Sequence, residues 1–252
     1  MSLFVSEPNL PVSCSSLIYG KKYAGILEKS LDSLHIESIL LPDNPDIDRR
    51  LSGHADLSVF HAGGERLFLA PYLKGSAFAS RLECRGALLD FPVSPQGREY
   101  PGDAQFNCCV VGKHVICNPK TAGTGIVDFL TKSGSKMCVP VRQGYSRCAV
   151  CVVDADSIIT EDRGISAAAK ATGLHVLLIR PGYIRLDGYP YGFIGGASCK
   201  LASDKLAFTG NLDTHPDREA ILAFLAERGI APVYLSQEPA FDIGSMIPLF
   251  EN

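Results

Sequence analysis

The chain contains 252 residues, of which 46% are hydrophobic and 20% charged, a balance typical of globular domains and unlike that of disordered proteins. The formal net charge of -3, with no Lys/Arg run longer than two residues, argues against nucleic acid as a partner. No apolar run approaches the length of a membrane span, and no signal peptide is evident. The nine cysteines, an odd number, fit free thiols in a reducing compartment. We therefore expect a cytoplasmic protein without a membrane partner.

In chain order, one pattern occurs five times: a helical stretch, an apolar strand, a polar turn and a second strand. The predicted helices are 22–34, 75–84, 123–132, 165–172 and 217–227. Each precedes an apolar run, namely IESILLP, GALLDFPV, KMCVPV, LHVLLIRPG or APVYLS. The last helix has the clearest signals, since Pro216 and Asp217 begin it, Ile221 and Leu225 supply an apolar stripe, and Gly229 ends it.

The second strand of each unit is predicted to lie innermost, in GHADLSVFHA, PGDAQFNCCVVG, YSRCAVCVVDA, GGASCKLA and DIGSMIPLF. Four of these strands continue through a turn into a return strand: RLFLAP, HVICNP, SIITED and KLAFTG. The fifth has no return strand before Asn252, whereas the segment 10–19 contains a spare strand-like stretch. We predict that this segment pairs with the last inner strand and closes the five units into a ring, because closure removes exposed sheet edges.

Regular spacing supports this organisation. The equivalent positions Asp56, Asp103, Arg147, Ala197 and Ser245 follow one another at intervals of 44 to 50 residues. The spacing predicts a single α/β domain over 1–252, with repeats at about 21–71, 72–119, 120–162, 163–210 and 211–252 closed by 10–19. An open doubly wound sheet is the alternative, but the glycine pairs lie in or beside hairpins and form no GxGxxG turn after the first strand.

Cys148 and Cys151 form a CxxC motif, which raises the question of a zinc site. The motif lies in CAVCVVD, an apolar run that reads as a buried strand, where positions i and i+3 point to opposite faces. No second ligand pair follows the motif. Both thiols are therefore interpreted as structural, and the sequence predicts neither a metal nor a cofactor.

Five such units around a short central channel resemble the pentein fold. Arginine and agmatine deiminases, dimethylarginine hydrolases, amidinotransferases and the ribosome anti-association factor share that fold. The resemblance covers essentially the whole chain and implies a five-bladed α/β propeller with pseudo-fivefold symmetry. It also implies a site in which carboxylates hold a guanidinium, a histidine in an HxD-like setting moves a proton, and a cysteine of the final unit attacks the guanidine carbon.

The first two units match this pattern. In GHAD, His54 and Asp56 are two residues apart and are expected to face the same side of an extended strand. The resemblance makes both of them catalytic candidates. Asp103 lies in PGD, and this stretch is similar to the turn by which the enzymes present a substrate carboxylate. Asp103 is therefore a candidate for substrate binding.

The third and fifth units depart from the pattern. Tyr145 stands near the position where the resemblance places a histidine, and Arg147 follows it. In the fifth unit, Asp242 and Ser245 precede Pro248, which occupies the position of the expected nucleophile. The candidates for substrate binding in these two units are Tyr145, Arg147, Asp242 and Ser245.

The fourth unit carries Cys199 at the equivalent inner-strand position, so Cys199 is interpreted as a displaced nucleophile with His54 as the proton carrier. The resemblance then implies a hydrolase or amidinotransferase-like enzyme that acts on a small cationic guanidine or amidine compound. Two alternatives stay open. One is a non-catalytic pentein that binds a small molecule or a protein, which Pro248 favours. The other is a divalent metal site at His54, Asp56 and Asp103.

Overall fold

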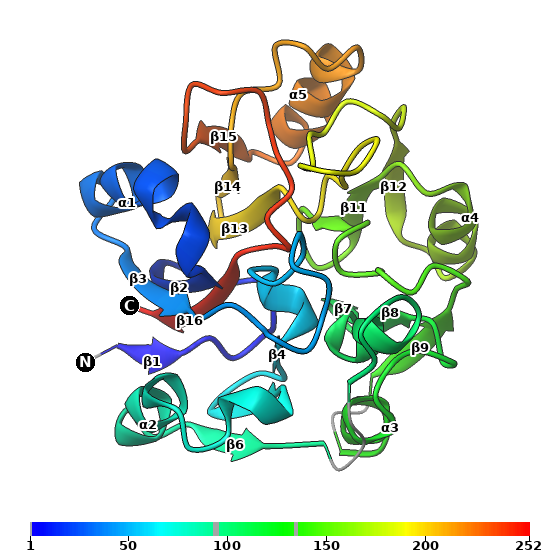
Figure 1. The fold of residues 1–252 in the computed structure, drawn as a ribbon. Helices are drawn as coiled ribbons and strands as arrows, with labels where there is room; N and C mark the ends of the chain where they lie inside the picture. Colours follow the sequence, from blue (N-terminus) through cyan, green and yellow to red (C-terminus); the bar gives the residue numbers. More distant parts are fainter. Residues whose placement is uncertain (1, 93–95, 134–135) are drawn as a thin grey trace.

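The strands form five small sheets arranged around a common centre, and the α-helices lie on the outside of this ring (Figure 1). The structure is a computed structural model that describes residues 2–92, 96–133 and 136–252. The predicted α/β ring of five units is confirmed. Each helix is placed outside the ring because only one of its faces is apolar; in the last helix, Ile221 and Leu225 are fully buried while Ala223 is exposed.

The predicted helices are present, with ends that differ by a few residues from those expected. They are α1 (Ala24–Ser33), α2 (Ala77–Cys84), α3 (Thr124–Asp128), α4 (Arg163–Ala171) and α5 (Arg218–Ala226). Shorter turns of helix are η1 (Lys21–Tyr23), η2 (Ala55–Leu57), η3 (Pro71–Leu73), η4 (Gly102–Phe106) and the π-helical η5 (Phe129–Ser133). Local capping fixes two of the starts, because the side chains of Ser76 and Asp162 accept hydrogen bonds from backbone N–H groups of α2 and α4.

Four of the sheets have three strands each and share one topology. They are β4 (Val59–His61), β5 (Arg66–Leu69) and β6 (Leu88–Asp90); β7 (Cys109–Val111), β8 (His114–Cys117) and β9 (Met137–Pro140); β10 (Cys151–Val152), β11 (Ser157–Thr160) and β12 (His175–Leu178); and β13 (Ser198–Ala202), β14 (Lys205–Phe208) and β15 (Ala231–Tyr234). In each sheet the first two strands form the predicted antiparallel hairpin, and the third strand adds in parallel after a helix. The outer strand of each sheet therefore comes from the repeat after the one that supplies the hairpin.

The fifth sheet joins the two ends of the chain. Its strands are arranged in the order β1 (Leu3–Phe4), β16 (Ile247–Glu251), β2 (Cys14–Gly20) and β3 (Glu37–Leu41). The last inner strand, β16, is antiparallel to both N-terminal strands, which confirms the predicted closure. Figure 1 shows the two termini close together beside this sheet.

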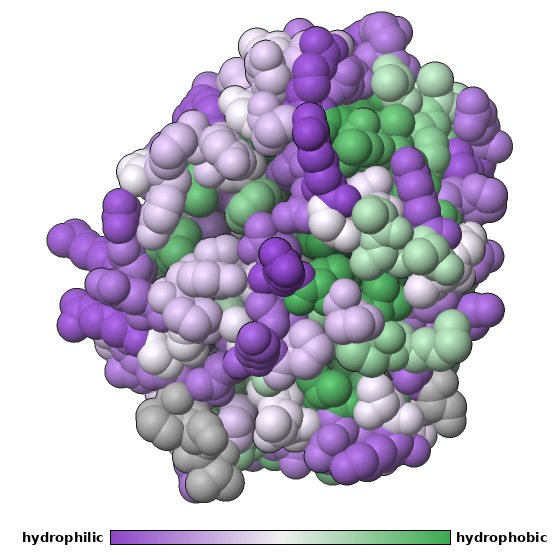
Figure 2. Space-filling view, turned by 90° about the vertical axis from the view of Figure 1, so that its right-hand side faces the viewer, coloured by the Kyte–Doolittle hydropathy of each residue, from purple (hydrophilic) through white to green (hydrophobic). Residues whose placement is uncertain are grey.

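The apolar core is divided into clusters that lie between neighbouring sheets and helices. One cluster combines residues of the closing sheet, such as Ile18, Ile39 and Leu249, with residues of the β4–β5–β6 sheet and α2. Packing between blades therefore holds the ring together as much as packing within each blade. On the face drawn in Figure 2, hydrophobic side chains gather from the middle to the upper right of the view, and hydrophilic ones cover most of the margins. Across the described residues, no helix has the length and apolar character needed to cross a membrane.

We expect Leu249→Ala to lower the free energy of unfolding by about 3 kcal/mol, because it leaves a cavity in the core of the closing sheet. Urea denaturation followed by circular dichroism measures this change. Leu3→Ala is the matched control, since Leu3 lies in the same sheet but is 68% exposed, and it should change stability by less than about 0.5 kcal/mol. Equal effects of the two substitutions would contradict the assigned pairing of β16.

Candidate functional site

The turns that precede the five inner strands meet at the centre of the ring and are joined in a closed circuit of hydrogen bonds. The backbone N–H groups of Asp56, Ser245 and Gly196 donate to the carbonyl groups of Gly244, Gly196 and Cys148, at 3.0, 3.0 and 2.8 Å. Asn107 completes the circuit with its side chain. Its Oδ1 accepts from the backbone N–H of Cys148 at 3.2 Å, and its Nδ2 donates to the carbonyl of Asp56 at 3.4 Å. Each blade is thus tied to the next at the level of the site.

Two glycines make this close approach possible. A Cβ atom on Gly244 would lie 2.2 Å from the Cβ of His54, and one on Gly196 would lie 1.9 Å from Oδ1 of Asp242. Gly244 also has a φ of +70°, a conformation that other residues rarely adopt. The glycines therefore let the backbone contact two candidate site residues directly.

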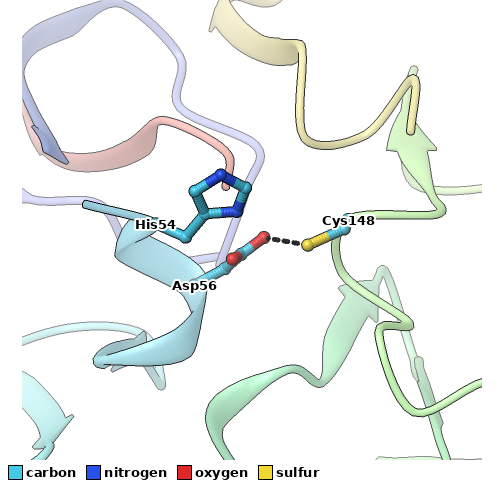
Figure 3. Close-up of side chains that lie close together, drawn as sticks. All are labelled: His54, Asp56 and Cys148. Carbon is cyan, nitrogen blue, oxygen red and sulfur yellow. Dashed lines mark hydrogen bonds between the residues drawn. The ribbon is translucent and has the colours of Figure 1, made fainter. Parts of the chain in front are cut away.

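Asp56 is the hub of the site. Its Oδ2 accepts hydrogen bonds from the thiol of Cys148 at 2.9 Å and from the hydroxyl of Ser245 at 2.8 Å. Figure 3 shows the thiol directed at the Asp56 carboxylate, with the imidazole of His54 beside it. The other oxygen, Oδ1, is buried and has no hydrogen-bond partner among the described residues. Three blades thus supply one acid, one thiol and one hydroxyl to a single point.

His54 and Asp242 form the other half of the site. His54 Nδ1 lies 3.9 Å from Asp242 Oδ1, and both side chains are almost completely buried. The carboxylate is fixed by the backbone N–H groups of Phe193, at 2.9 Å, and Gly244, at 2.8 Å. Nε2 of His54 has no hydrogen-bond partner in the described part of the chain, so this nitrogen is available to a ligand.

A cavity of about 290 Å³ opens onto this cluster. His54, Cys148 and Asp242 contribute its ionisable groups. The remaining lining residues are apolar or aromatic: Leu51, Leu57, Tyr145, Leu186, Tyr189, Pro190, Tyr191 and Phe193. A larger hollow of about 630 Å³ shares Leu186 and Asp242 with the cavity and includes charged side chains of both signs. A small ligand can therefore lie against the thiol while the rest of it extends into the larger hollow.

Burial shifts the ionisation of all four central groups. It raises the pKa of Asp56, and burial together with the charge of Asp56 raises the pKa of Asp242 to about 7. Burial, and then the charge of Lys22, lower the pKa of His54 to about 3. Burial and the two carboxylates raise the pKa of Cys148 well above its usual range. At neutral pH the free protein thus holds a thiol and an uncharged imidazole, and a bound cation would lower the pKa of that thiol.

Arg147 provides a buried positive charge behind the site. Its side chain donates to the carbonyl groups of Val150 at 3.2 Å and Gly195 at 3.3 Å. Its charge acts against the effect of burial on the pKa values of Asp56 and Asp242. Arg147 is not among the residues that line the 290 Å³ cavity, so its place favours electrostatic support over contact with a ligand.

The structure brings most of the predicted site residues together. Tyr145 lines the cavity, and its hydroxyl donates to Oδ2 of Asp103 at 2.7 Å, so Asp103 acts on the cavity through Tyr145. Cys199 lies elsewhere, because it packs on β13 in an apolar cluster with residues such as Cys14 and Leu17. Burial raises the pKa of Cys199 well above its usual range. The structure therefore does not place Cys199 beside His54.

The local conformation of two segments differs from the one expected. His54 is the residue directly before η2 and Asp56 lies within η2, ahead of the strand β4, so the two are not in an extended strand. Cys148 lies in a turn, at 146–149, and the strand begins only at Cys151. The interpretation of CAVCVVD as one buried strand was therefore wrong, and it concealed Cys148. The sequence did contain one signal for Cys148, because it follows Arg147, which stands at the position in the repeat that is equivalent to Asp56.

His54, Asp56 and Cys148 also form a possible metal site. One potential ligand atom from each lies within 4.8 Å of the other two, and all three residues are buried. Imidazole, carboxylate and thiolate are ligands that zinc accepts, and three protein ligands beside a cavity leave a position open. This set shares His54 and Asp56 with the metal site that the sequence left open as an alternative, but Cys148 takes the place of Asp103.

The comparisons with known proteins agree with this architecture. The model of a family described as "Family of unknown function (DUF6873)" matches residues 19–247. No curated protein matches the sequence. Among solved structures, an amidinotransferase from the saxitoxin pathway of Microseira wollei is 10% identical, with a TM-score of 0.56 over 92% of this chain and 91% of that chain.

Two further solved structures give the same result. The DDAH of Pseudomonas aeruginosa, complexed with citrulline, is 9% identical, with a TM-score of 0.55 over 94% of this chain and 100% of that chain. An agmatine deiminase of C. jejuni with its substrate bound is 11% identical, with a TM-score of 0.57 over 98% and 96%. These likenesses confirm the pentein fold.

We expect Gly196→Ala to lower the free energy of unfolding by about 3 kcal/mol or more, because the added methyl group overlaps the Asp242 carboxylate. Gly125→Ala in α3 is the matched control. Its Cβ would meet only ordinary contacts, and alanine should stabilise this helix by about 0.5 kcal/mol. Chemical denaturation of both variants measures the difference, and a neutral Gly196→Ala would contradict the close contact.

Glu161, behind the Phe193–Ile194 backbone, generates a prediction about pH. Burial raises its pKa to about 8; its Oε1 accepts from the N–H of Ile194, and its Oε2 has no hydrogen-bond partner among the described residues. Between about pH 5 and 8 the native state therefore holds a proton that the unfolded chain has lost, so this group stabilises the protein at low pH and the contribution is lost as pH rises.

Glu161→Gln keeps the acceptor oxygen and removes the titration. We expect the stability of this variant relative to the wild type to increase as pH rises from about 5 to 8. Denaturation curves across this range measure the trend. Glu83→Gln, on the exposed surface of α2, controls for the change in net charge. If the difference in stability between the variant and the wild type did not change with pH, Glu161 would have the same pKa in the folded and the unfolded protein.

Proposed function

Because the chain belongs to the DUF6873 family and has the pentein fold, we propose that it is a thiol-dependent enzyme that modifies a small guanidine or amidine compound. The observation that carries this proposal is the hydrogen bond from the Cys148 thiol to the Asp56 carboxylate at the end of the 290 Å³ cavity. The substrate class is suggested by proteins of the same fold, which include an agmatine deiminase and two amidinotransferases.

The cavity suits a planar cation. Asp242 is a carboxylate in its lining, and carboxylates bind guanidinium groups through paired hydrogen bonds. Tyr145, Tyr189 and Phe193 supply aromatic walls, whose faces attract cations. A neutral ligand would not offset the charge of the buried carboxylates, whereas a guanidinium would. The same cation would lower the pKa of Cys148, so binding prepares the nucleophile.

In the first chemical step, the proton of Cys148 passes to Asp56, with which the thiol already shares a hydrogen bond. The sulfur forms a bond to the guanidine carbon, and the C–N bond to the leaving amine breaks. The leaving nitrogen takes up the proton held by Asp56, so that ammonia or an amine departs and an amidine group stays on the sulfur. His54, which is uncharged, can accept a hydrogen bond or a proton during this transfer.

In the second step, water attacks the same carbon and the C–S bond breaks. One proton of the water returns to the thiolate of Cys148, the other passes through His54 to solvent, and the product is a urea or ureido compound. An amine in place of water would receive the amidine group, which is the transferase reaction. The larger hollow beside Asp242, whose rim includes Lys22, provides room for the remainder of the substrate or for the acceptor.

A metal-dependent hydrolase is the second candidate, and the cluster of His54, Asp56 and Cys148 favours it. A zinc ion there would require the thiolate as a ligand and would leave no free nucleophile. Metal analysis of the purified protein separates the two candidates. Stoichiometric zinc, together with activity that a chelator abolishes, would support the second candidate and contradict the first.

We expect arginine, agmatine, methylated arginines or related amidines to raise the melting temperature, and at least one of them to be converted to a ureido product. Cys148→Ser should reduce turnover by roughly a thousandfold or more while ligand binding is kept, because serine lacks the nucleophilic sulfur. Asp242→Asn should weaken binding, because the amide removes the negative charge. Thermal shifts, calorimetry and colorimetric detection of ureido groups provide the measurements.

Cys199→Ser is the matched control for the loss of a buried thiol, and it should keep both binding and turnover. Loss of turnover in Cys199→Ser with full activity in Cys148→Ser would reverse the assignment. Binding of a guanidine compound without turnover of any candidate would support the alternative, a non-catalytic pentein that binds a small molecule.

A further inference from the structure

A second group of thiols lies in the β7–β8–β9 sheet. Cys117 is the last residue of β8, and Cys138 lies in the neighbouring strand β9. Their sulfur atoms are 3.8 Å apart. Neither residue is among those that line the 290 Å³ cavity, and the chemistry of Cys148 uses neither of them. Two thiols at this distance need an explanation of their own.

The two thiols differ in access. Cys117 is fully buried, whereas Cys138 is exposed, so a small reactant can reach the pair from the side of β9. β9 is the outer strand of its sheet and pairs only with β8 in that sheet. A disulfide requires a sulfur–sulfur distance of about 2.0 Å. Side-chain rotation and a small shift of this edge strand can shorten the contact without disturbing the central strands.

A third thiol influences the pair. Cys108 lies directly before β7, and its hydrogen bond to Cys117, followed by that from Cys138, lowers the pKa of Cys117 from its ordinary value in spite of burial. The pKa of Cys138 is raised by burial, to about 11. Cys138 is the thiol that an oxidant in solvent reaches first, because it is exposed while Cys117 is fully buried behind it.

We propose that Cys117 and Cys138 are a site of reversible oxidation, at which a peroxide converts two thiols into a disulfide. The sulfur of Cys138 attacks one peroxide oxygen, the O–O bond breaks, the leaving oxygen takes the thiol proton, and a sulfenic acid and one molecule of water form. The sulfur of Cys117 then attacks the sulfenic sulfur of Cys138, the S–O bond breaks, and a second molecule of water leaves with the proton of Cys117. Two thiols and one peroxide thus yield one disulfide and two waters.

The sequence allows a direct test by peptide mapping. Trypsin cuts after Lys113, Lys120, Lys136 and Arg142, which places Cys117 in the peptide 114–120 and Cys138 in the peptide 137–142. Cys108 falls in the separate peptide 99–113. The reduced full-length protein is treated with hydrogen peroxide at a low molar ratio, free thiols are alkylated, and the digest is analysed by mass spectrometry without reduction.

We expect a cross-linked pair of peptides 114–120 and 137–142, which dithiothreitol reverses. Cys138→Ser should abolish it, whereas Cys84→Ser, which removes another exposed thiol in α2, should leave it unchanged. Since Cys138 is exposed, its serine variant should keep the melting temperature of the reduced wild type, and this measurement is made first. Absence of the cross-link in the folded wild type, or a link from Cys117 to Cys108 instead, would overturn the proposal.

Discussion

The closed circuit of hydrogen bonds among the five central turns is the constraint on which the site depends. Each turn donates to or accepts from the next blade, and the side chain of Asn107 connects the second blade to both of its neighbours. Buried backbone groups are costly unless they are paired, so the circuit fixes the positions of the turns relative to one another. The architecture of the ring, and not proximity in the sequence, then brings together His54, Asp56, Cys148 and Asp242.

This arrangement concentrates acidic groups in a place where water cannot solvate them. Asp56 and Asp242 share the centre with the guanidinium of Arg147, and burial raises the pKa of both carboxyl groups. The free protein therefore bears an electrostatic cost that a bound cation would reduce. Aromatic side chains around the cavity would also attract a bound cation, because the faces of their rings are partially negative. The proposed preference for a cationic ligand and the protonated state of Cys148 have one common cause, which is the burial of charge.

The sequence predicted the repeat, the five helices, the four hairpins and the closure by β2, because these features depend on local periodicity and turn residues. It also singled out His54, Asp56 and Asp242, the first two because they stand two residues apart in GHAD, and all three because of the resemblance to the pentein enzymes. The conformation of 146–149 could not be predicted in this way. Its residues are apolar enough for a strand, and the turn is held by Asn107, which belongs to another blade. Cys199 was chosen for its position in the repeat, but the side chain faces the core between blades.

The pairing of β16 with β2 has a consequence for how the protein is made. Residues 14–20 leave the ribosome early, whereas residues 247–251, which cover one edge of that strand, leave it more than two hundred residues later. A nascent chain therefore carries an open sheet edge through most of its synthesis, and the four preceding blades can form before the circle is complete. Such an edge can pair with another chain, so translation speed and chaperone occupancy matter more for this topology than for one in which neighbouring segments pair in order.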